Sequence, residues 1–250
     1  MTQAIPQGAR GPAAPEVEHH DQLTDLIKLA DERYRCRGDR ARASSLSTGE
    51  SGSDRAGQWR PEVERLVDGS YELEWRLSRA LFLDGEKNSE LYALGAMHGR
   101  RAADLDRKRV EGHFWMGVNL ALHAEARKGL RGALDLLKAR WALGRACEIS
   151  EDYHGAGPLR VLGRLDHKSP RILGGNLERS LIHYERALAI APTNTVTLVY
   201  AAQLQIDRRD LKRAAFLLET VMGLPIDPDW EFENIRDKNL AKSMLERLQR

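Results

Sequence analysis

The chain has 250 residues, of which 42% are hydrophobic and 30% are charged, a balance that suits a soluble helical protein. The formal net charge of +2 gives the chain no strong attraction to nucleic acid or to an anionic membrane. Only two cysteines occur, so neither a disulfide framework nor a zinc site with Cys/His spacing is expected. No apolar run reaches the roughly 18 residues of a membrane span.

The N-terminal part is predicted to differ from the rest of the chain. Residues 1–20 are rich in Pro, Gly, Ala and Gln and are expected to be flexible. They show no basic stretch followed by an apolar one, so we expect a cytoplasmic protein; the alternative is a periplasmic protein whose true start lies upstream. Residues 21–68 are predicted to form a degenerate first helical pair, with a helix over 21–37, a polar linker over 41–57 and a short return helix over 59–67.

The remainder, residues 69–250, is predicted to be a succession of helices. Apolar residues recur at helical spacing from Tyr71 onward, and Gly and Pro mark the turns. One insertion, with Pro170 and two glycines, lies at 167–175. The predicted helices span 71–83, 91–105, 110–127, 134–149, 153–165, 176–192, 195–207, 211–222 and 230–250.

Two of these helices repeat one another. Ser180, Tyr184 and Ala187 share one helical face, and Ala214, Leu218 and Val221 repeat their small–large–small order 34 residues later. This period is typical of the second helix of a tetratricopeptide (TPR) unit. The fold class predicted is therefore all-α, a TPR-like helical-repeat solenoid of four to five helix pairs, with the last helix as a C-terminal cap.

Small residues in the second predicted helix indicate close packing. Gly95, Gly99 and Ala102 lie at i, i+4 and i+7, on one face. Glycine costs roughly 1 kcal/mol against alanine inside a helix, so its presence needs a reason. Close approach of a neighbouring helix is the reason we favour over a phosphate-binding loop, because no strand precedes the glycines.

Three sequence segments, which occur in a fixed order, point to a particular family of helical-repeat proteins. They are VEGHFWMGVNLALHAEA at 110–126, YHGAGPLRVLGRL at 153–165 and LGGNLERSLIHYERALAIAP at 173–192. Over residues 71–250 the chain resembles the T-component family of tripartite ATP-independent periplasmic (TRAP) transporters, and the regulator-of-microtubule-dynamics family shares a similar pattern. The resemblance implies a non-enzymatic, lipid-anchored, oligomeric protein with a ligand cleft, which assembles with a periplasmic solute-binding protein. The absence of a visible export signal departs from that family.

Catalysis has little support in the sequence. The histidines are scattered, no H-E-x-x-H or G-x-S-x-G pattern occurs, and no catalytic residue, cofactor or metal is predicted. We expect the histidines at the surface or at helix ends. Basic stretches such as 100–109 are interrupted by acids and carry no recognition motif, so nucleic acid is not an expected partner.

Partner binding is better supported. In a solenoid the first helix of each pair lines the concave face, and an apolar groove with arginines suits an amphipathic peptide or an organic acid. We therefore predict a scaffold that binds a protein partner and a small organic or hydrophobic ligand there, as a homo-oligomer or a subunit of a larger complex. The alternative is a cytoplasmic TPR adaptor for a peptide segment of another protein. The concave-face candidates are Trp75, Arg79, Phe114, Val118, Asn119, Arg160, Arg164, Val199 and Gln203.

For each candidate a purely structural role competes with ligand binding. Trp75 and Phe114 are also the kind of residues that pack between neighbouring helices. Arg160 and Arg164, one turn apart, are also able to form salt bridges with local acids. Asn119, in an apolar helix, needs hydrogen-bond partners if it is buried, and these are either a neighbouring segment or a ligand.

Overall fold

The computed structural model of the chain describes residues 69–85, 88–127 and 129–249, together with seven positions nearer the N-terminus. Those seven, residues 25, 27, 28, 31, 32, 34 and 35, are all helical, as predicted for 21–37. The predicted flexible segment 1–20, the polar linker 41–57 and the return helix 59–67 lie outside the described residues.

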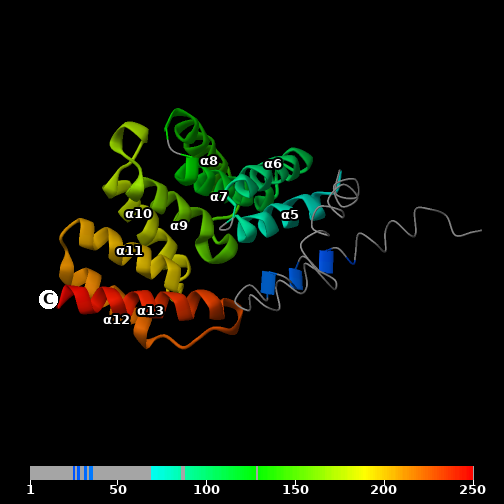
Figure 1. The fold of residues 1–250 in the computed structure, drawn as a ribbon. Coiled ribbons are helices and arrows are strands. Elements are labelled where there is room, and N and C mark those ends of the chain that lie inside the picture. Colours follow the sequence, from blue (N-terminus) through cyan, green and yellow to red (C-terminus); the bar gives the residue numbers. More distant parts are fainter. Residues whose placement is uncertain are drawn as a thin grey trace, which may run out of the picture.

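The described part of the chain is all-helical and contains no strand (Figure 1). Consecutive helices are joined by short turns, two of which contain a 3₁₀-helix. The elements are α5 (Tyr71–Asp84), α6 (Glu90–Leu105), α7 (Val110–Arg127), α8 (Gly129–Ile149), α9 (Tyr153–Lys168), η1 (Arg171–Leu173), α10 (Leu177–Ile190), α11 (Thr195–Asp207), α12 (Leu211–Gly223), η2 (Pro228–Trp230) and α13 (Glu231–Leu248).

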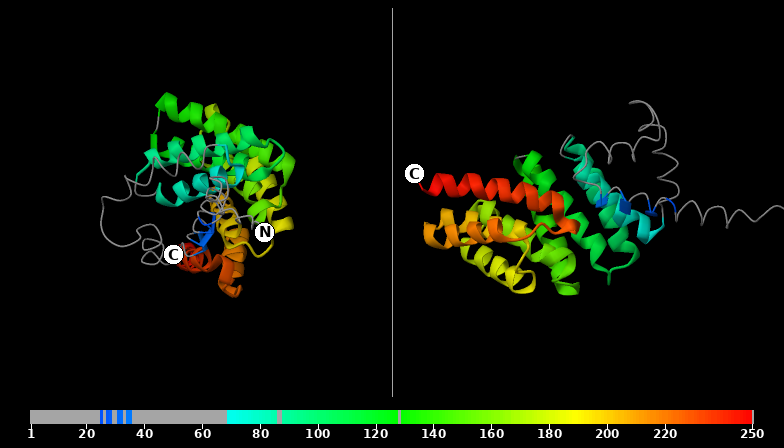
Figure 2. Two further views of the ribbon diagram at one scale, coloured as in Figure 1. Left: turned by 90° about the vertical axis from the view of Figure 1, so that its right-hand side faces the viewer. Right: turned by 90° about the horizontal axis from the view of Figure 1, so that it is seen from below.

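Helices that follow one another in sequence pack side by side, which confirms the predicted helical-repeat arrangement. The pairs α5/α6, α7/α8, α9/α10 and α11/α12 account for four of the predicted four to five helix pairs. The last helix, α13, packs against α11 and α12, where a capping helix would lie (Figure 2). Whether each pair is a TPR unit in the strict sense stays a prediction.

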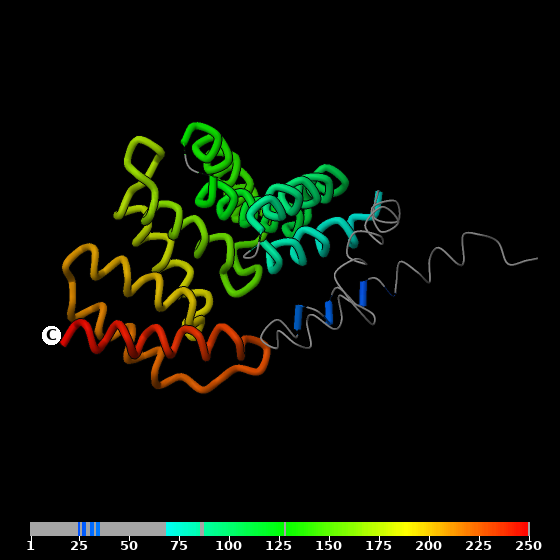
Figure 3. Tube along the Cα trace, viewed as in Figure 1, coloured from blue at the N-terminus to red at the C-terminus, as the bar shows by residue number. Residues whose placement is uncertain are grey.

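Helix α9 lies between the α5–α8 half and the α11–α13 half (Figure 3), and the buried apolar residues form two main cores, one in each half. Trp115 and Leu143 are central to the first core, and Tyr184 and Leu218 to the second. A smaller cluster, including Leu159 of α9, lies between α9 and α10. The repeated positions are all fully buried, namely Ser180, Tyr184, Ala187, Ala214, Leu218 and Val221.

The predicted close approach at the α6 glycines is confirmed. A Cβ on Gly99 would lie 2.6 Å from the backbone nitrogen of Met116 in α7, and one on Gly95 would lie 2.5 Å from the Asn119 side chain. In the same interface a Cβ on Gly112 would lie 2.6 Å from the backbone nitrogen of Ala103. Helices α6 and α7 therefore meet at a distance that leaves no room for a side chain at these positions.

Two helix starts differ from the prediction. Helix α8 begins at Gly129 rather than near residue 134, and Gly132 lies inside it, where a Cβ would come 2.8 Å from the Ala124 carbonyl oxygen. Gly132, which suggested a turn, instead permits the close approach of α7 to α8. In α9, His154, Gly155 and Ala156 have φ of 56°, 62° and 59°, a left-handed turn that precedes the regular helix.

The histidines are more buried than their predicted surface or helix-end positions suggest. His98, His113, His123 and His167 are all buried, although His167 does lie in the last turn of α9. Hydrogen-bond partners compensate for that burial: His123 Nδ1 lies 3.0 Å from Asp135, and His167 Nε2 lies 2.6 Å from Asp207 on a later helix. Such pairs join residues 12 and 40 positions apart, which no local pattern indicates.

Candidate functional site

A groove of about 490 Å³ runs between the two halves of the molecule. Helices α7, α8 and α9 form one side of it, and α11, η2 and α13 form the other. The C-terminal helix α13 runs back along the molecule after α12 (Figure 3). It therefore completes a groove whose other side is formed by the earlier helices. The groove is apolar and aromatic toward α7 and carries arginines on α9 and α13.

The aromatic end is built around Phe114 and Trp115 of α7. Their rings meet edge to face with centroids 5.0 Å apart. The left-handed turn before α9 places the His154 ring against both of them and against Trp230 of η2, whose ring centroid is 4.9 Å away. His154 Nε2 also lies 2.5 Å from the hydroxyl of Tyr34, so the N-terminal helix contributes to this end of the groove.

Arg160 is the most unusual side chain in the groove, because its guanidinium is buried yet forms no ion pair among the described residues. Its exposed fraction is only 5%. It donates hydrogen bonds to the backbone oxygens of Gly155, at 2.7 Å, and His154, at 3.3 Å, and to the side-chain oxygen of Asn194, at 3.4 Å. Burial lowers the pKa of this guanidinium, yet arginine stays protonated in proteins. A buried cation held only by neutral oxygens retains affinity for an anion.

Arg164 lies one turn further along α9 and also forms no ion pair within the described part of the chain. Its guanidinium donates to the side-chain oxygen of Gln203, at 2.6 Å, and lies over the Tyr200 ring, 4.5 Å from the centroid. The other groove cations are neutralised: Lys168 pairs with Asp207 and Arg236 with Asp237. The electrostatic attraction for an anion is therefore concentrated at Arg160 and Arg164.

The sequence candidates separate into two sets. Phe114, Val118, Arg160 and Arg164 line the groove. Gln203 is not part of the lining, but its side-chain oxygen accepts a hydrogen bond from Arg164. Trp75, Arg79, Asn119 and Val199 do not line the groove. That any of the nine contacts a ligand stays a prediction.

Trp75, Arg79, Asn119 and Val199 contact other parts of the protein. Trp75 and Val199 are buried in the first and second cores. Arg79 pairs with Asp31, at 2.6 Å, and so fastens the N-terminal helix to α5. Asn119 is fully buried, and its amide donates to the backbone oxygens of Ser78, at 3.0 Å, and Trp115, at 2.9 Å, which joins α7 to α5.

Sequence reasoning missed much of the groove wall. It took its candidates only from the first helix of each pair. Trp230, Glu233 and Arg236 also line the groove, and they come from η2 and α13. Sequence reasoning also did not foresee the left-handed turn at His154, Gly155 and Ala156. A tryptophan two residues after Pro228, and an aromatic pair directly before a glycine, were the available signals.

Other kinds of site have no support within the described ranges. They contain no cluster of three His, Cys, Asp or Glu side chains arranged to hold a metal ion. None of the described helices combines the length and the apolar character that a membrane crossing requires.

Comparison with known protein families gives one match. The profile of the TRAP transporter T-component family matches residues 79–250, well over half of the chain. The matched part runs from the middle of α5 to residue 250 and includes the α7–α13 elements that form the groove. A comparison with curated proteins returned no match.

Proposed function

Because the chain belongs to the T-component family of TRAP transporters, we propose that it is a non-enzymatic scaffold whose groove binds an organic anion with an apolar body. Membership in a family of transporter components supports a binding role rather than a catalytic one. In this proposal the carboxylate lies against Arg160 and Arg164, and the apolar body extends toward Phe114 and Trp115. The protein partner is a solute-binding protein, which the family assignment supports.

The observation that carries the proposal is the state of Arg160. Burying a charge is costly unless a counter-charge or full hydrogen bonding compensates for it. Here every hydrogen bond of the guanidinium goes to a neutral oxygen, at the wall of a groove that is open to a ligand. A carboxylate is the planar anion that a guanidinium binds through two parallel hydrogen bonds. The adjoining aromatic rings supply apolar surface for the remainder of the ligand.

Decanoate is a suitable probe, because it joins a carboxylate to a flexible apolar chain. Calorimetric titration of the full chain is expected to show saturable binding. Arg164→Gln should weaken that binding by about tenfold or more, since it removes one charge-assisted hydrogen-bonding group. Arg160→Lys should weaken it as well, because a lysine ammonium has no planar fork.

Arg213→Gln is the matched control. The guanidinium of Arg213 also lies over an aromatic ring, that of Phe216, with 5.2 Å to the centroid, but on α12 and outside the groove. This variant should bind decanoate as the wild type does. Equal losses for Arg164→Gln and Arg213→Gln would mean that decanoate responds to overall charge, and the proposed site would be wrong.

A further inference from the structure

The N-terminal helix closes the aromatic end of the groove with one side chain, that of Tyr34. The Tyr34 ring lines the groove together with Phe82, Phe114 and Trp115. It meets the Trp115 ring nearly edge-on, with centroids 6.0 Å apart. Its hydroxyl lies 2.5 Å from Nε2 of His154, which comes 120 positions later in the chain. An apolar ligand body that extends from the arginines toward Phe114 and Trp115 therefore meets the Tyr34 ring.

Contacts with α5 hold the Tyr34 ring in this position. The Arg79 guanidinium lies over the ring, 4.4 Å from its centroid. Arg79 also pairs at 2.6 Å with Asp31, which lies one turn before Tyr34, and Arg76 donates to the same carboxylate at 3.0 Å. Burial raises the pKa of Asp31, but the hydrogen bonds from Arg76 and Arg79 more than offset it and lower that pKa, so the carboxylate is charged at neutral pH. Tyr34 is therefore fastened both through its ring and through its helix.

The space that the Tyr34 ring fills is bounded by other apolar rings. Phe82 of α5 and Trp115 of α7 both line the groove, and their ring centroids lie 5.5 Å apart. Trp115 is only 2% exposed, and Phe82 is half-buried. Without the Tyr34 ring, these two rings would offer apolar surface to a longer chain, and burial of each further methylene group on such surface is favourable. The size of this end of the groove is therefore set by Tyr34.

We infer that Tyr34 is a specificity-determining residue of the groove, whose ring is the stop that limits the length of the apolar body of a carboxylate ligand. The inference rests on the proposed function, because it concerns the same groove and the same class of ligand. A purely structural role, in which Tyr34 only fastens the N-terminal helix, predicts that truncating Tyr34 changes the affinity for all ligands alike. A stop predicts instead that the truncation changes the preference between short and long chains.

The test is calorimetric titration of the full chain with saturated carboxylates from octanoate to tetradecanoate, each below its critical micelle concentration. In the wild type, affinity should rise about fourfold with each added methylene while the chain still fits, and should level off once the chain end reaches Tyr34. Tyr34→Ala should move that plateau to longer chains and raise the ratio of tetradecanoate affinity to decanoate affinity by about tenfold or more. Because the expected effect is a gain, a variant that is merely destabilised does not reproduce it.

Tyr34→Phe separates the role of the ring from that of the hydroxyl. This variant keeps the ring that meets the chain end but loses the hydrogen bond to His154. Its ratio of tetradecanoate to decanoate affinity should stay close to that of the wild type, because Trp115 and Arg79 still contact the ring. A ratio that rises as far in Tyr34→Phe as in Tyr34→Ala would show that the hydrogen bond rather than the ring sets the limit, and would overturn the inference.

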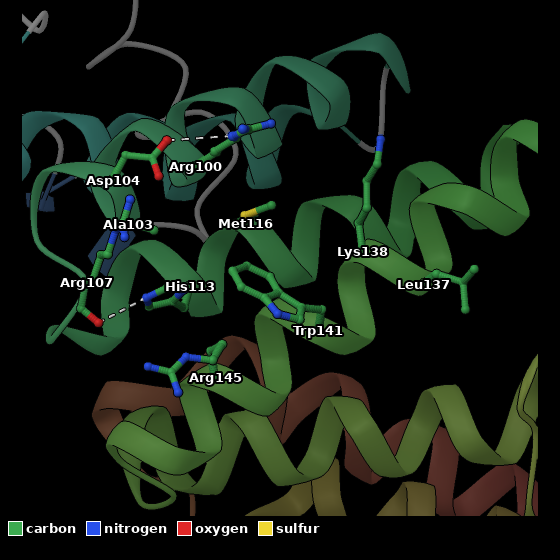
Figure 4. Close-up of a pocket in the computed structure, with 10 residues that line it drawn as sticks. All are labelled: Arg100, Ala103, Asp104, Arg107, His113, Met116, Leu137, Lys138, Trp141 and Arg145. Carbon is green, nitrogen blue, oxygen red and sulfur yellow. Dashed lines mark hydrogen bonds and ion pairs between the residues drawn. The ribbon is translucent and has the colours of Figure 1, made fainter.

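Trp141→Ala is the matched control, because the molecule has a second apolar hollow that is open to a chain-like ligand. This hollow, of about 700 Å³, lies between α6, α7 and α8, and Met116, Leu137 and Trp141 are among the residues that line it (Figure 4). It shares no lining residue with the groove. Trp141→Ala should therefore leave the affinity ratio unchanged. A ratio that moves as far in this variant as in Tyr34→Ala would place the chain ends outside the groove and overturn the inference.

The titrations also separate this inference from the proposed function. Decanoate binding by the wild type, with an unchanged affinity ratio in Tyr34→Ala, would overturn the stop and leave the proposed function standing. No binding of any carboxylate or alkanol by the wild type would overturn both. Alkanols that bind as tightly as carboxylates, with a ratio of tetradecanol to decanol affinity that rises in Tyr34→Ala, would refute the anion site and support the stop.

Discussion

At the scale of single residues, burial separates what the sequence could predict from what it could not. The apolar register identified Tyr184 and its repeat-mate Leu218 as packing residues, and both are fully buried. Polar burial escaped the same reasoning. Glu74 is fully buried beside His98, with 2.6 Å between carboxylate and imidazole, although a lone glutamate in an amphipathic helix is expected to be exposed. The partners lie 24 residues apart, and only the folded structure reveals the pair.

Tyr184 gives the residue-scale prediction. Tyr184→Ala should lower the free energy of unfolding by roughly 3–5 kcal/mol, because it empties the centre of the second core. Tyr184→Phe keeps the ring and should cost less than about 1.5 kcal/mol. Urea titration measures both. A loss below about 1 kcal/mol for Tyr184→Ala would mean that the register of α10 is misassigned.

At the scale of helices, sequence periodicity located the elements well and their beginnings less well. The bounds of α7 and α11 agree with prediction, because a strong apolar pattern is flanked by clear turn residues. The start of α8 was missed since Gly129 and Gly132 were read as turn residues, whereas the second permits close packing against α7. The left-handed turn at 154–156 was not predicted, because His154 and Ala156 rarely adopt positive φ.

Alanine substitutions at two helical glycines are predicted to change the stability of the protein in opposite directions. Gly99→Ala should destabilise the protein, because the new methyl group would meet the backbone of Met116, which has little freedom to move. Gly144→Ala should stabilise it by up to about 1 kcal/mol, because nothing lies within 4 Å and alanine is the better helix former. Thermal unfolding of both variants is the measurement, and a stabilising Gly99→Ala would contradict the tight α6–α7 contact.

At the scale of the whole molecule, the groove depends on contacts between distant parts of the chain. Register reasoning placed Arg160 and Arg164 on a concave face, and both do line the groove. It could not foresee that η2 and α13 would close the opposite side, since long-range packing leaves no periodic trace in sequence. An exposed apolar face of α8 was missed for a related reason: Trp141 and Leu137 look like core residues until the packed face of the helix is known.

Acid should weaken the joint between α5 and the start of α7. Burial alone would raise the pKa of Glu72, but hydrogen bonds from Arg109, Arg76 and Trp75 more than offset it and lower that pKa from 4.5 to about 2. The unfolded chain therefore takes up a proton at higher pH than the folded one, so the contribution of Glu72 is complete above about 4.5 and is lost as pH falls toward about 2.

Glu72→Gln tests this directly. The stability difference between wild type and variant should be largest at neutral pH and should shrink as pH falls through that window, as urea titrations at a series of pH values would record. Because Glu72 is partly exposed, salt should reduce the difference at neutral pH as well. A difference that stays constant across the window would show that the carboxylate is not held by these bonds in the folded state.

The central claim is that the groove recognises a carboxylate through Arg160 and Arg164 and an apolar body through its aromatic end. The most direct measurement compares decanoate with decanol by calorimetric titration of the same wild-type protein, because the two ligands share a chain and differ in the charged group. The account predicts that decanoate binds at least about tenfold more tightly. Equal affinities, or tighter binding of decanol, would contradict it.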